Sequence, residues 1–257
     1  MSAPKNPALL QIDNLAKRFG GIVATDNVSL AIPQGELHAL IGPNGAGKTT
    51  LIAQLSGSLF ADGGRIQFDG HDITRLSMPK RSHLGLARSF QITSLFLDMS
   101  VLDNVALAVQ AHAGHSFSFW HDARAEVALR QPAREALARV GLAASADKVT
   151  AELSHGEHRL LELAMALAVK PRMLLLDEPM AGLGPEESAR MVEMLRDIKR
   201  DYTILLVEHD MEAVFALADR ITVLVYGRVI ATGVPNDIRA NAQVREAYLG
   251  DAEVAHG

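Results

Sequence analysis

The sequence contains no cysteine among its 257 residues. This absence excludes a disulfide scaffold and a thiolate metal site, and it suits a reducing compartment without requiring one. There is no excess of basic residues either, because the formal net charge is −5. The overall charge therefore gives no indication of sequence-independent binding to nucleic acid, although it is compatible with a local basic patch.

Long apolar runs are also missing. The longest, AMALAV at 164–169 and ITVLVY at 221–226, are far below the ~20 residues that cross a bilayer. The first thirteen residues lack the apolar centre that a secretory signal needs. We therefore expect no membrane span and no export by that route, so that any role at a membrane depends on a partner.

What the chain does contain is typical of a folded protein. Hydrophobic residues make up 48% and charged residues 21% of the sequence, which argues against disorder and against a fibrous repeat. The length suits one large domain or a domain with an insertion.

The pattern along the chain changes twice. Short strands are expected at 9–12, 28–32 and 37–42, and a helix is expected at 48–57 after a glycine-rich loop. Residues 91–149 are rich in alanine and leucine at helical spacing, which predicts an inserted helical lobe. After it, strands and helices alternate, a pattern that favours a parallel sheet covered by helices.

A phosphate-binding motif lies between the third strand and the first helix. GPNGAGKT, at 42–49, matches G-x-x-x-x-G-K-[ST] at every fixed position. Glycines let consecutive N–H groups turn toward a phosphate, while the lysine supplies positive charge and the threonine hydroxyl can bind Mg²⁺. We expect nucleotide contacts at Gly42, Pro43, Asn44, Gly45, Ala46, Gly47, Lys48, Thr49 and Thr50.

Two later strands end in acidic residues. The run MLLLDE ends in Asp177 and Glu178, and carboxylates at this end of a parallel strand face the ligand crevice. Asp177 would hold Mg²⁺ and Glu178 would polarise the attacking water. The run LLVEHD ends in Glu208, His209 and Asp210 before another helix. His209 could donate a hydrogen bond to a γ-phosphate or simply lie next to a helix cap.

An amphipathic helix is expected to begin near Gly156, in the stretch LSHGEHRLLELA at 153–164. Ser154 occupies the N-cap position. From the residues alone, two interpretations stay open: the serine caps the helix and does nothing else, or this helix start also binds an anion.

In order, the phosphate loop, LSHGE and LLLDEP resemble the motifs of ATP-binding cassette (ABC) ATPases, and the resemblance covers nearly the whole chain. It implies an α/β fold, with a P-loop NTPase (RecA-like) core, an N-terminal antiparallel β subdomain and an inserted helical subdomain. In that family the LSGGQ-type helix start caps the γ-phosphate of ATP held by a second subunit. The residues so placed in trans are Ser154, His155, Gly156 and Glu157.

The resemblance also assigns single residues. Phe19 would stack on adenine, with a place in the β-lobe core as the alternative. Gln91 would contact Mg²⁺ and sense a membrane partner, and the loop AGLGP at 181–185 would cross to the opposite subunit. The catalytic residues would be Glu178, His209 and Lys48, and the metal ligands Thr49, Gln91 and Asp177.

Three positions depart from the family pattern. His155 replaces the first glycine of the GG pair, Glu157 stands for the usual glutamine, and Gly184 lies where the crossing loop usually has Asp or Asn. The missing side chain at 184 puts in doubt how the two sites communicate. His155 points into solvent or, when protonated, strengthens the hold on ATP.

Segments at 17–30, 85–109 and 227–250 resemble the ATPases of branched-chain amino acid uptake systems. We therefore expect an ATP-hydrolysing subunit that powers uptake of branched-chain or related hydrophobic amino acids. Urea or amide uptake, lipopolysaccharide export and a nucleotide-dependent interaction module are the alternatives. A GTPase lacks support because there is no N-K-x-D motif, and a chromosome ATPase would carry a long coiled-coil insertion.

The expected cofactors are ATP and Mg²⁺. The expected partners are a second ATPase subunit, transmembrane permeases and a solute-binding protein, with no nucleic acid. Through the permeases the chain would lie on the inner face of the cell membrane. The predicted divisions are a core at 7–90 and 158–235, a helical subdomain at 91–157, and a C-terminal helix and tail at 236–257.

Overall fold

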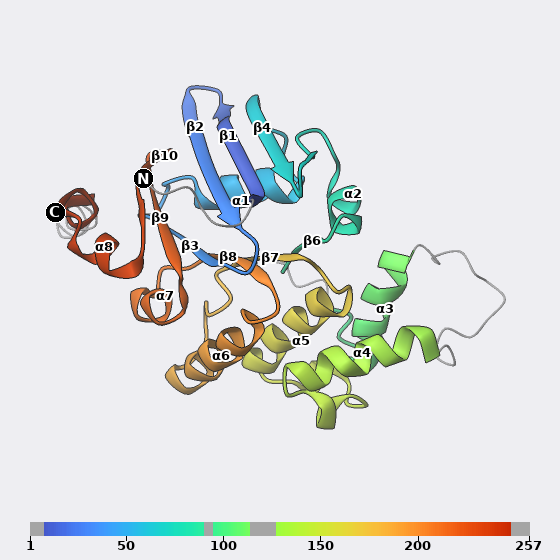
Figure 1. Ribbon diagram of the computed structural model, residues 1–257. Coiled ribbons are helices and arrows are strands. Elements are labelled where there is room, and N and C mark those ends of the chain that lie inside the picture. Colours follow the sequence, from blue (N-terminus) through green and yellow to red (C-terminus); the bar gives the residue numbers. More distant parts are fainter. Residues whose placement is uncertain (1–7, 90–94, 114–126, 248–257) are drawn as a thin grey trace.

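The computed structural model describes residues 8–89, 95–113 and 127–247, which form two sheets and the helices around them (Figure 1). Gln91, which the resemblance places at Mg²⁺ and at a membrane partner, lies outside the described residues.

The smaller sheet is antiparallel, with the strand order β2-β1-β4-β5. Its strands are β1 (Ala8–Phe19), β2 (Ile22–Pro33), β4 (Gly63–Phe68) and β5 (His71–Asp72). The strands predicted at 9–12 and 28–32 are therefore parts of longer strands. Their pairing continues through several irregularities, such as the one between Ile12 and Leu15, where a simple alternation of apolar residues fails.

The larger sheet has the order β10-β9-β3-β8-β7-β6. Its strands are β3 (Leu37–Ile41), β6 (Leu86–Arg88), β7 (Met173–Asp177), β8 (Thr203–Val207), β9 (Arg220–Val225) and β10 (Arg228–Gly233). All neighbouring pairs are parallel except β9 with β10. The carboxyl ends of β3, β6, β7 and β8 consequently meet along one edge, where ligands bind in open α/β sheets.

Both faces of the parallel sheet are buried, in two apolar cores. Alternate residues of one strand belong to different cores: Leu174 and Leu176 of β7 face one, and Leu175 faces the other. The first core lies under the helices around the sheet, and the second lies between the two sheets with α1 (Lys48–Ser56). Burial on both faces explains why these strands are continuously apolar.

Helix α1 begins at Lys48, within the phosphate-loop motif, and its C-cap is Gly57, which adopts a φ of 82°, as its stop signal predicts. Its last carbonyl groups are held by Arg81 of α2 (Met78–His83), which donates to Gln54 and Leu55 at 2.6 and 2.7 Å. Burial lowers the pKa of Arg81 to about 10. The C-terminus of the phosphate-loop helix is thus anchored by a buried cation.

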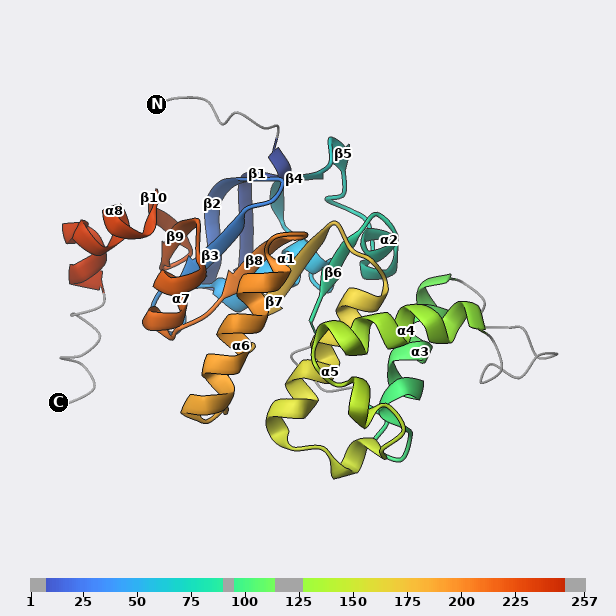
Figure 2. The same cartoon turned by 60° about the horizontal axis from the view of Figure 1, so that its bottom comes forward.

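Three helices pack together at one side of the molecule, coloured green to yellow in Figures 1 and 2. They are α3 (Val101–Ala113), α4 (Val127–Arg139) and α5 (His155–Ala168), with the short 3-10 helices Ala143–Ser145 and Thr150–Glu152 between the last two. The remaining helices are α6 (Pro185–Ile198), α7 (Met211–Leu217) and α8 (Pro235–Ala240). The α/β fold with a small antiparallel sheet is confirmed.

Candidate nucleotide site

The phosphate loop has a backbone that only glycine allows at two points. Gly42 and Gly47 have φ values of 154° and 102°. A Cβ on Gly42 would lie 2.0 Å from the carbonyl oxygen of Leu224, and one on Gly47 would lie 2.1 Å from that of Ala24. Gly45 also has a positive φ, of 76°, but faces open space. The loop therefore packs closely against β9 at Gly42 and against β2 at Gly47, whereas its tip at Gly45 has no close neighbour.

The inner side of the loop is attached to the rest of the core by backbone hydrogen bonds. Ala46 donates to Pro43 at 3.2 Å and accepts from Gly227 at 2.9 Å, while Gly227 accepts from Asp26 at 2.8 Å. Asn44 and Gly45 at the tip are exposed. The loop is thus held from behind, and its front remains accessible to a ligand.

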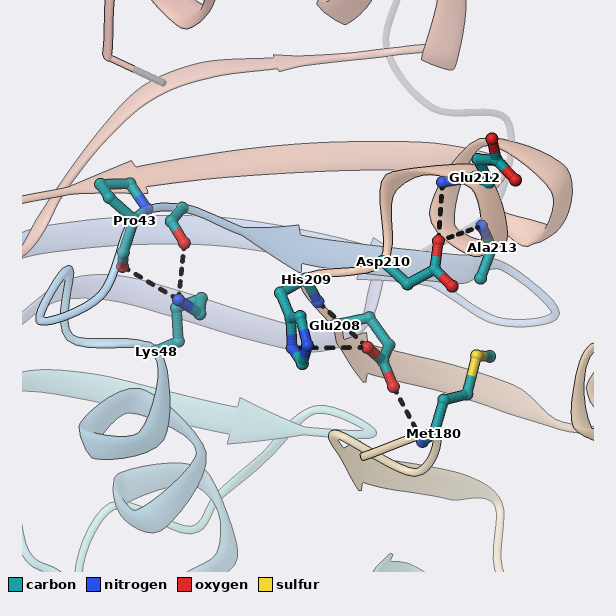
Figure 3. Close-up of polar contacts among 9 residues, drawn as sticks. Pro43, Lys48, Met180, Glu208, His209, Asp210, Glu212 and Ala213 are labelled. Atoms are coloured by element: carbon teal, nitrogen blue, oxygen red, sulfur yellow. Dashed lines mark hydrogen bonds and ion pairs between the residues drawn. The ribbon is translucent and has the colours of Figure 1, made fainter. Parts of the chain in front are cut away.

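Lys48 folds back over this loop (Figure 3). Its Nζ donates to the carbonyl oxygens of Gly42 and Pro43 at 2.6 and 3.0 Å. Burial lowers the pKa of Lys48, and the negative charges of Glu178 and Asp177 oppose this effect. A nearly buried cation therefore lies where the first turn of α1 begins, as the motif predicts.

At the end of β7, Asp177 is buried and forms an ion pair with Arg88 of β6, with Nη2 and Oδ2 2.9 Å apart. Its second oxygen, Oδ1, is buried without a hydrogen-bond partner. Burial raises the pKa of Asp177, while Arg88 and Lys48 lower it. Arg88 was missed in the sequence because β6 has only three residues, too few for a periodic pattern.

Glu178 follows with a φ of 51°, unusual for a residue other than glycine. Its N–H donates to the carbonyl oxygen of Val207 in β8 at 2.9 Å, and its side chain is partly exposed. Strained backbone of this kind persists where surrounding contacts maintain it. The chain therefore bends at Glu178, directly after the buried carboxylate of Asp177, and the carboxylate of Glu178 stays accessible.

The residues present suit Mg²⁺. The unpartnered, buried Oδ1 of Asp177 is a hard oxygen donor, and the exposed Thr49 offers a hydroxyl. Among the described residues, no group of three or more His, Asp or Glu could hold a metal alone. A cation here would depend on phosphate oxygens and water for its other ligands, as Mg²⁺ commonly does.

Glu208 connects the segment after β7 to the end of β8 by hydrogen bonds. The sequence did not predict this structural role. Its side chain is fully buried, and its two oxygens accept from different backbone groups, Met180 N–H at 2.9 Å and His209 N–H at 3.0 Å (Figure 3). The His209 ring is largely exposed, with Nδ1 3.8 Å from Glu208 Oε2. Glu208 therefore fixes His209 relative to the segment that follows Glu178.

The next residue, Asp210, caps helix α7. Its Oδ1 accepts from both Glu212 and Ala213, at 2.9 and 3.1 Å (Figure 3). His209 is thus the neighbour of a helix cap, and its exposed ring remains available to a ligand.

Helix α5 begins at His155, with Ser154 as its N-cap. Ser154 Oγ accepts from the Glu157 N–H at 3.2 Å, and the Ser154 N–H donates to Glu157 Oε2 at 2.8 Å. This reciprocal pair is a capping box, so the predicted cap is confirmed and Glu157 has a structural role. Ser154 and His155 are nevertheless exposed, which leaves this helix start accessible to a second molecule.

The start of α5 packs against the start of α6 in the same chain. A Cβ on Gly156 would lie 2.5 Å from Glu187 Oε1, and Glu187 Oε2 accepts from the Gly184 N–H at 3.2 Å. The His155 Nε2 would lie 3.0 Å from a Cβ on Gly182. The His155 ring is thus exposed but lies beside the loop at 181–185, and Glu187 joins the two helix starts.

Phe19 lies at the end of β1, and 49% of its surface is exposed. Lys17 Nζ lies 5.6 Å from the centre of its ring. Phe19 belongs to neither buried core, and this exposure favours contact with a ligand over a role in the β-lobe core.

Comparisons with known proteins agree with this geometry. The family model described as ABC transporter matches residues 25–181. A second model, described as branched-chain amino acid ATP-binding cassette transporter, matches residues 228–254. Within the part of the chain that the structure describes, no helix is long and apolar enough to cross a membrane.

Individual relatives match over nearly their whole length. The high-affinity branched-chain amino acid transport ATP-binding protein LivG of Salmonella typhimurium is 38% identical, covering 95% of this chain and 98% of the relative. BraF of Pseudomonas aeruginosa, described in the same words, is 36% identical with the same coverage. The solved ADP conformation of MJ1267, an ATP-binding cassette of an ABC transporter, is 30% identical, with a TM-score of 0.84 and coverage of 95% and 99%.

Proposed function

This chain belongs to the ABC transporter family and is an ATPase of that family, and we propose that it powers the uptake of branched-chain or related hydrophobic amino acids. One observation supports the ATPase site most strongly. Parallel strands bring the lysine-bearing loop, the acidic pair Asp177 and Glu178, and His209 to one edge of the sheet. Cationic, metal-binding and water-activating groups are the set that phosphoryl transfer requires.

ATP would bind along the front of the phosphate loop. The backbone N–H groups of 42–50 and the N-terminus of α1 would surround the phosphates. Lys48, now bound to the carbonyls of Gly42 and Pro43, would exchange these partners for phosphate oxygens. The exposed ring of Phe19 would stack on the adenine.

Asp177, Thr49 and Gln91 would hold Mg²⁺, which when bound neutralises charge that develops on the phosphate oxygens. In hydrolysis, water attacks the γ-phosphorus, its bond to the bridging oxygen breaks, and ADP and inorganic phosphate form. Glu178 would orient this water and take its proton. His209 would donate a hydrogen bond to the γ-phosphate, held in place by Glu208.

A second copy or a homologous ATPase would complete each site. The helix start at Ser154, His155, Gly156 and Glu157 would bind the γ-phosphate of the ATP on the other subunit. The exposure of Ser154 and His155, whose backbone is already fixed by the capping box, supports this arrangement. Head-to-tail pairing of two such chains gives two equivalent sites and closes the assembly.

Permeases would dock on the helical subdomain, for which we propose the limits 91–157, with a core at 7–90 and 158–235 and a C-terminal part at 236–257. Helix α5 spans the limit at 157, so it would carry movement from the nucleotide to the helical subdomain. The chain would work on the inner face of the membrane through these permeases, together with a solute-binding protein.

The choice of solute rests on the C-terminal region, because residues 228–254 match a family model of branched-chain amino acid transporters. Uptake of labelled leucine by vesicles that contain this chain and its permeases tests it. Uptake that requires ATP and competes with isoleucine and valine supports the proposal. ATP-dependent transport of urea or amides, with no leucine uptake, would overturn it.

The Glu178→Gln variant tests hydrolysis. We expect ATP turnover to fall by about 10² to 10⁴-fold, as is typical for loss of a general base, while ATP binding persists. Glu186→Gln is the matched control, because Glu186 is a highly exposed acid of the first turn of α6. Unchanged turnover in Glu178→Gln would remove Glu178 from the mechanism.

A further inference from the structure

Arg88 donates a hydrogen bond from Nη2 to Oδ2 of Asp177 at 2.9 Å, and the pair is well shielded from water. The Asp177 side chain is 1% exposed and that of Arg88 is 15% exposed. A buried carboxylate without a cation is costly, and loss of one member of such a pair typically destabilises a protein strongly. We therefore expect loss of Arg88 to lower stability much more than loss of an exposed ion pair would.

Backbone pairing fixes where Arg88 lies. Arg88 is in register with Leu175 of the parallel strand β7, two residues before Asp177. The next residue, Ser89, donates its N–H to the Leu175 carbonyl oxygen at 2.9 Å. Backbone pairing thus places Arg88 beside the acidic end of β7.

The two carboxylate oxygens of Asp177 differ. Oδ2 accepts from Arg88, whereas Oδ1 is buried without a partner. Buried polar atoms are normally satisfied, so Oδ1 points to a ligand that is bound during function. A divalent cation there would place two positive charges next to the carboxylate, to which Arg88 now donates a hydrogen bond.

We propose that Arg88 is a positioning residue: before nucleotide binds, its hydrogen bond to Oδ2 keeps the Asp177 carboxylate charged and correctly oriented. When Mg²⁺ binds at Oδ1, the metal supplies much of the positive charge that stabilises this carboxylate. The proposal rests on the proposed Mg²⁺ site. Its consequence is that the protein depends on Arg88 most when Mg²⁺ is absent.

Thermal unfolding of Arg88→Met under three conditions tests this: EDTA alone, ADP with EDTA, and ADP with Mg²⁺. In EDTA we expect the midpoint to fall by about 5 to 10 °C, because a buried carboxylate loses its partner. ADP with Mg²⁺ should restore at least half of this loss, and ADP with EDTA should restore none. Arg88→Lys, which keeps the charge, should recover part of the midpoint in EDTA.

The control is Arg65→Met, which removes an exposed ion pair with Asp72 and should shift the midpoint by less than about 2 °C in every condition. An equal loss for Arg88→Met in all three conditions would mean a purely structural role and would overturn the inference. If Arg88→Met does not fold, Arg88→Gln replaces it, because glutamine keeps a hydrogen-bond donor but no charge. Its unfolding midpoints are then compared under the same three conditions.

Asp177→Asn separates the two proposals. In this variant the extra stabilisation by Mg²⁺ over ADP alone should disappear. If it persists, the assignment of the Mg²⁺ site is wrong. If it disappears while Arg88→Met and the unaltered protein gain equally from Mg²⁺, the site stands and the inference about Arg88 fails.

Discussion

The phosphate loop and the start of helix α5 are built in different ways. The loop depends on distant segments, since Gly42 and Gly47 lie against Leu224 and Ala24 and Ala46 accepts from Gly227. The cap of α5 is formed by its own residues, through the reciprocal bonds of Ser154 and Glu157, with Glu187 of α6 beside Gly156. Contacts with β2, β9 and Gly227 hold the first from behind before any ligand binds. The second is ordered by its cap and exposed at Ser154 and His155, as the proposed contact with another subunit's nucleotide requires.

This difference implies that equal chemical changes have unequal effects in the two regions. A methyl group at Gly42 or Gly47 would meet backbone of β9 or β2 that cannot move without disturbing the sheets. A change at the start of α5 affects one helix cap and, under the proposed arrangement, the contact with the nucleotide of a second subunit.

The largest effect is expected for Gly47→Ala. Its Cβ would lie 2.1 Å from the Ala24 carbonyl oxygen, at a φ of 102°. We expect a loss of stability of more than about 3 kcal/mol and the loss of ADP binding. Urea unfolding and ADP titration measure both.

Gly45→Ala is the matched control within the same loop, because nothing lies within 4 Å of its added Cβ. Only its positive φ is unfavourable, which costs about 1 to 2 kcal/mol. Similar losses in the two variants would show that contact with β2 is not what requires glycine at 47.

A smaller effect is expected for Glu208→Gln. Both oxygens of Glu208 accept from backbone N–H groups, so an amide must turn its NH₂ toward one of these donors. We expect a loss of about 1 to 3 kcal/mol and a fall in ATP turnover of at least about tenfold. Thermal unfolding and steady-state turnover provide the measurements.

Asp210→Asn is the contrast, two residues away. Asp210 uses a single oxygen, Oδ1, for both of its bonds, and an amide retains one oxygen. Its stability and turnover should stay close to those of the unaltered protein. The prediction for Glu208 fails if both variants behave alike.

At the start of α5, Ser154→Ala should cost about 1 kcal/mol through loss of the cap. Ser154→Asp keeps a good cap but places a carboxylate against the neighbour's phosphate. We therefore expect Ser154→Asp to keep its unfolding midpoint and to weaken ATP-driven dimerisation at least about tenfold, measured by light scattering. Normal dimerisation of Ser154→Asp would argue against a phosphate contact in trans.

The smallest effect concerns Glu162, which lies two turns into α5 and is buried. Burial raises its pKa, although the hydrogen bond from Arg159 opposes this. The folded state therefore holds this proton to higher pH than the unfolded state, so the contribution of Glu162 to stability declines as pH rises above about 4.5 and is least favourable at neutral pH.

Glu162→Gln removes the free-energy cost of burying an ionised carboxylate at neutral pH. We expect its midpoint to exceed that of the unaltered protein by about 2 to 4 °C at pH 8, which corresponds to about 1 kcal/mol, and to equal it near pH 4.5. Unfolding curves between these values measure the difference. A difference that shrinks as pH rises would contradict the direction of the pKa shift.

Local patterns predicted the elements that local chemistry defines. Helix α1 begins within the phosphate-loop motif and has Gly57 as its C-cap, and Ser154 caps α5, because glycine and serine act within one turn of chain. The five-residue strands β7 and β8 were recognisable from their continuous apolar runs. The short elements β5, β6 and α2 were not, since each has too few residues to display a period.

The sequence by itself identified the phosphate loop, the acidic strand ends and the capped helix, because each can be recognised from residues that are adjacent in the chain. Only the tertiary structure decided that Arg88 pairs with Asp177, that Glu208 joins Met180 to His209, and that Glu187 lies against Gly156. Arg88 and Asp177 are 89 residues apart. Such contacts follow from the order and register of strands, which no short pattern of side chains records.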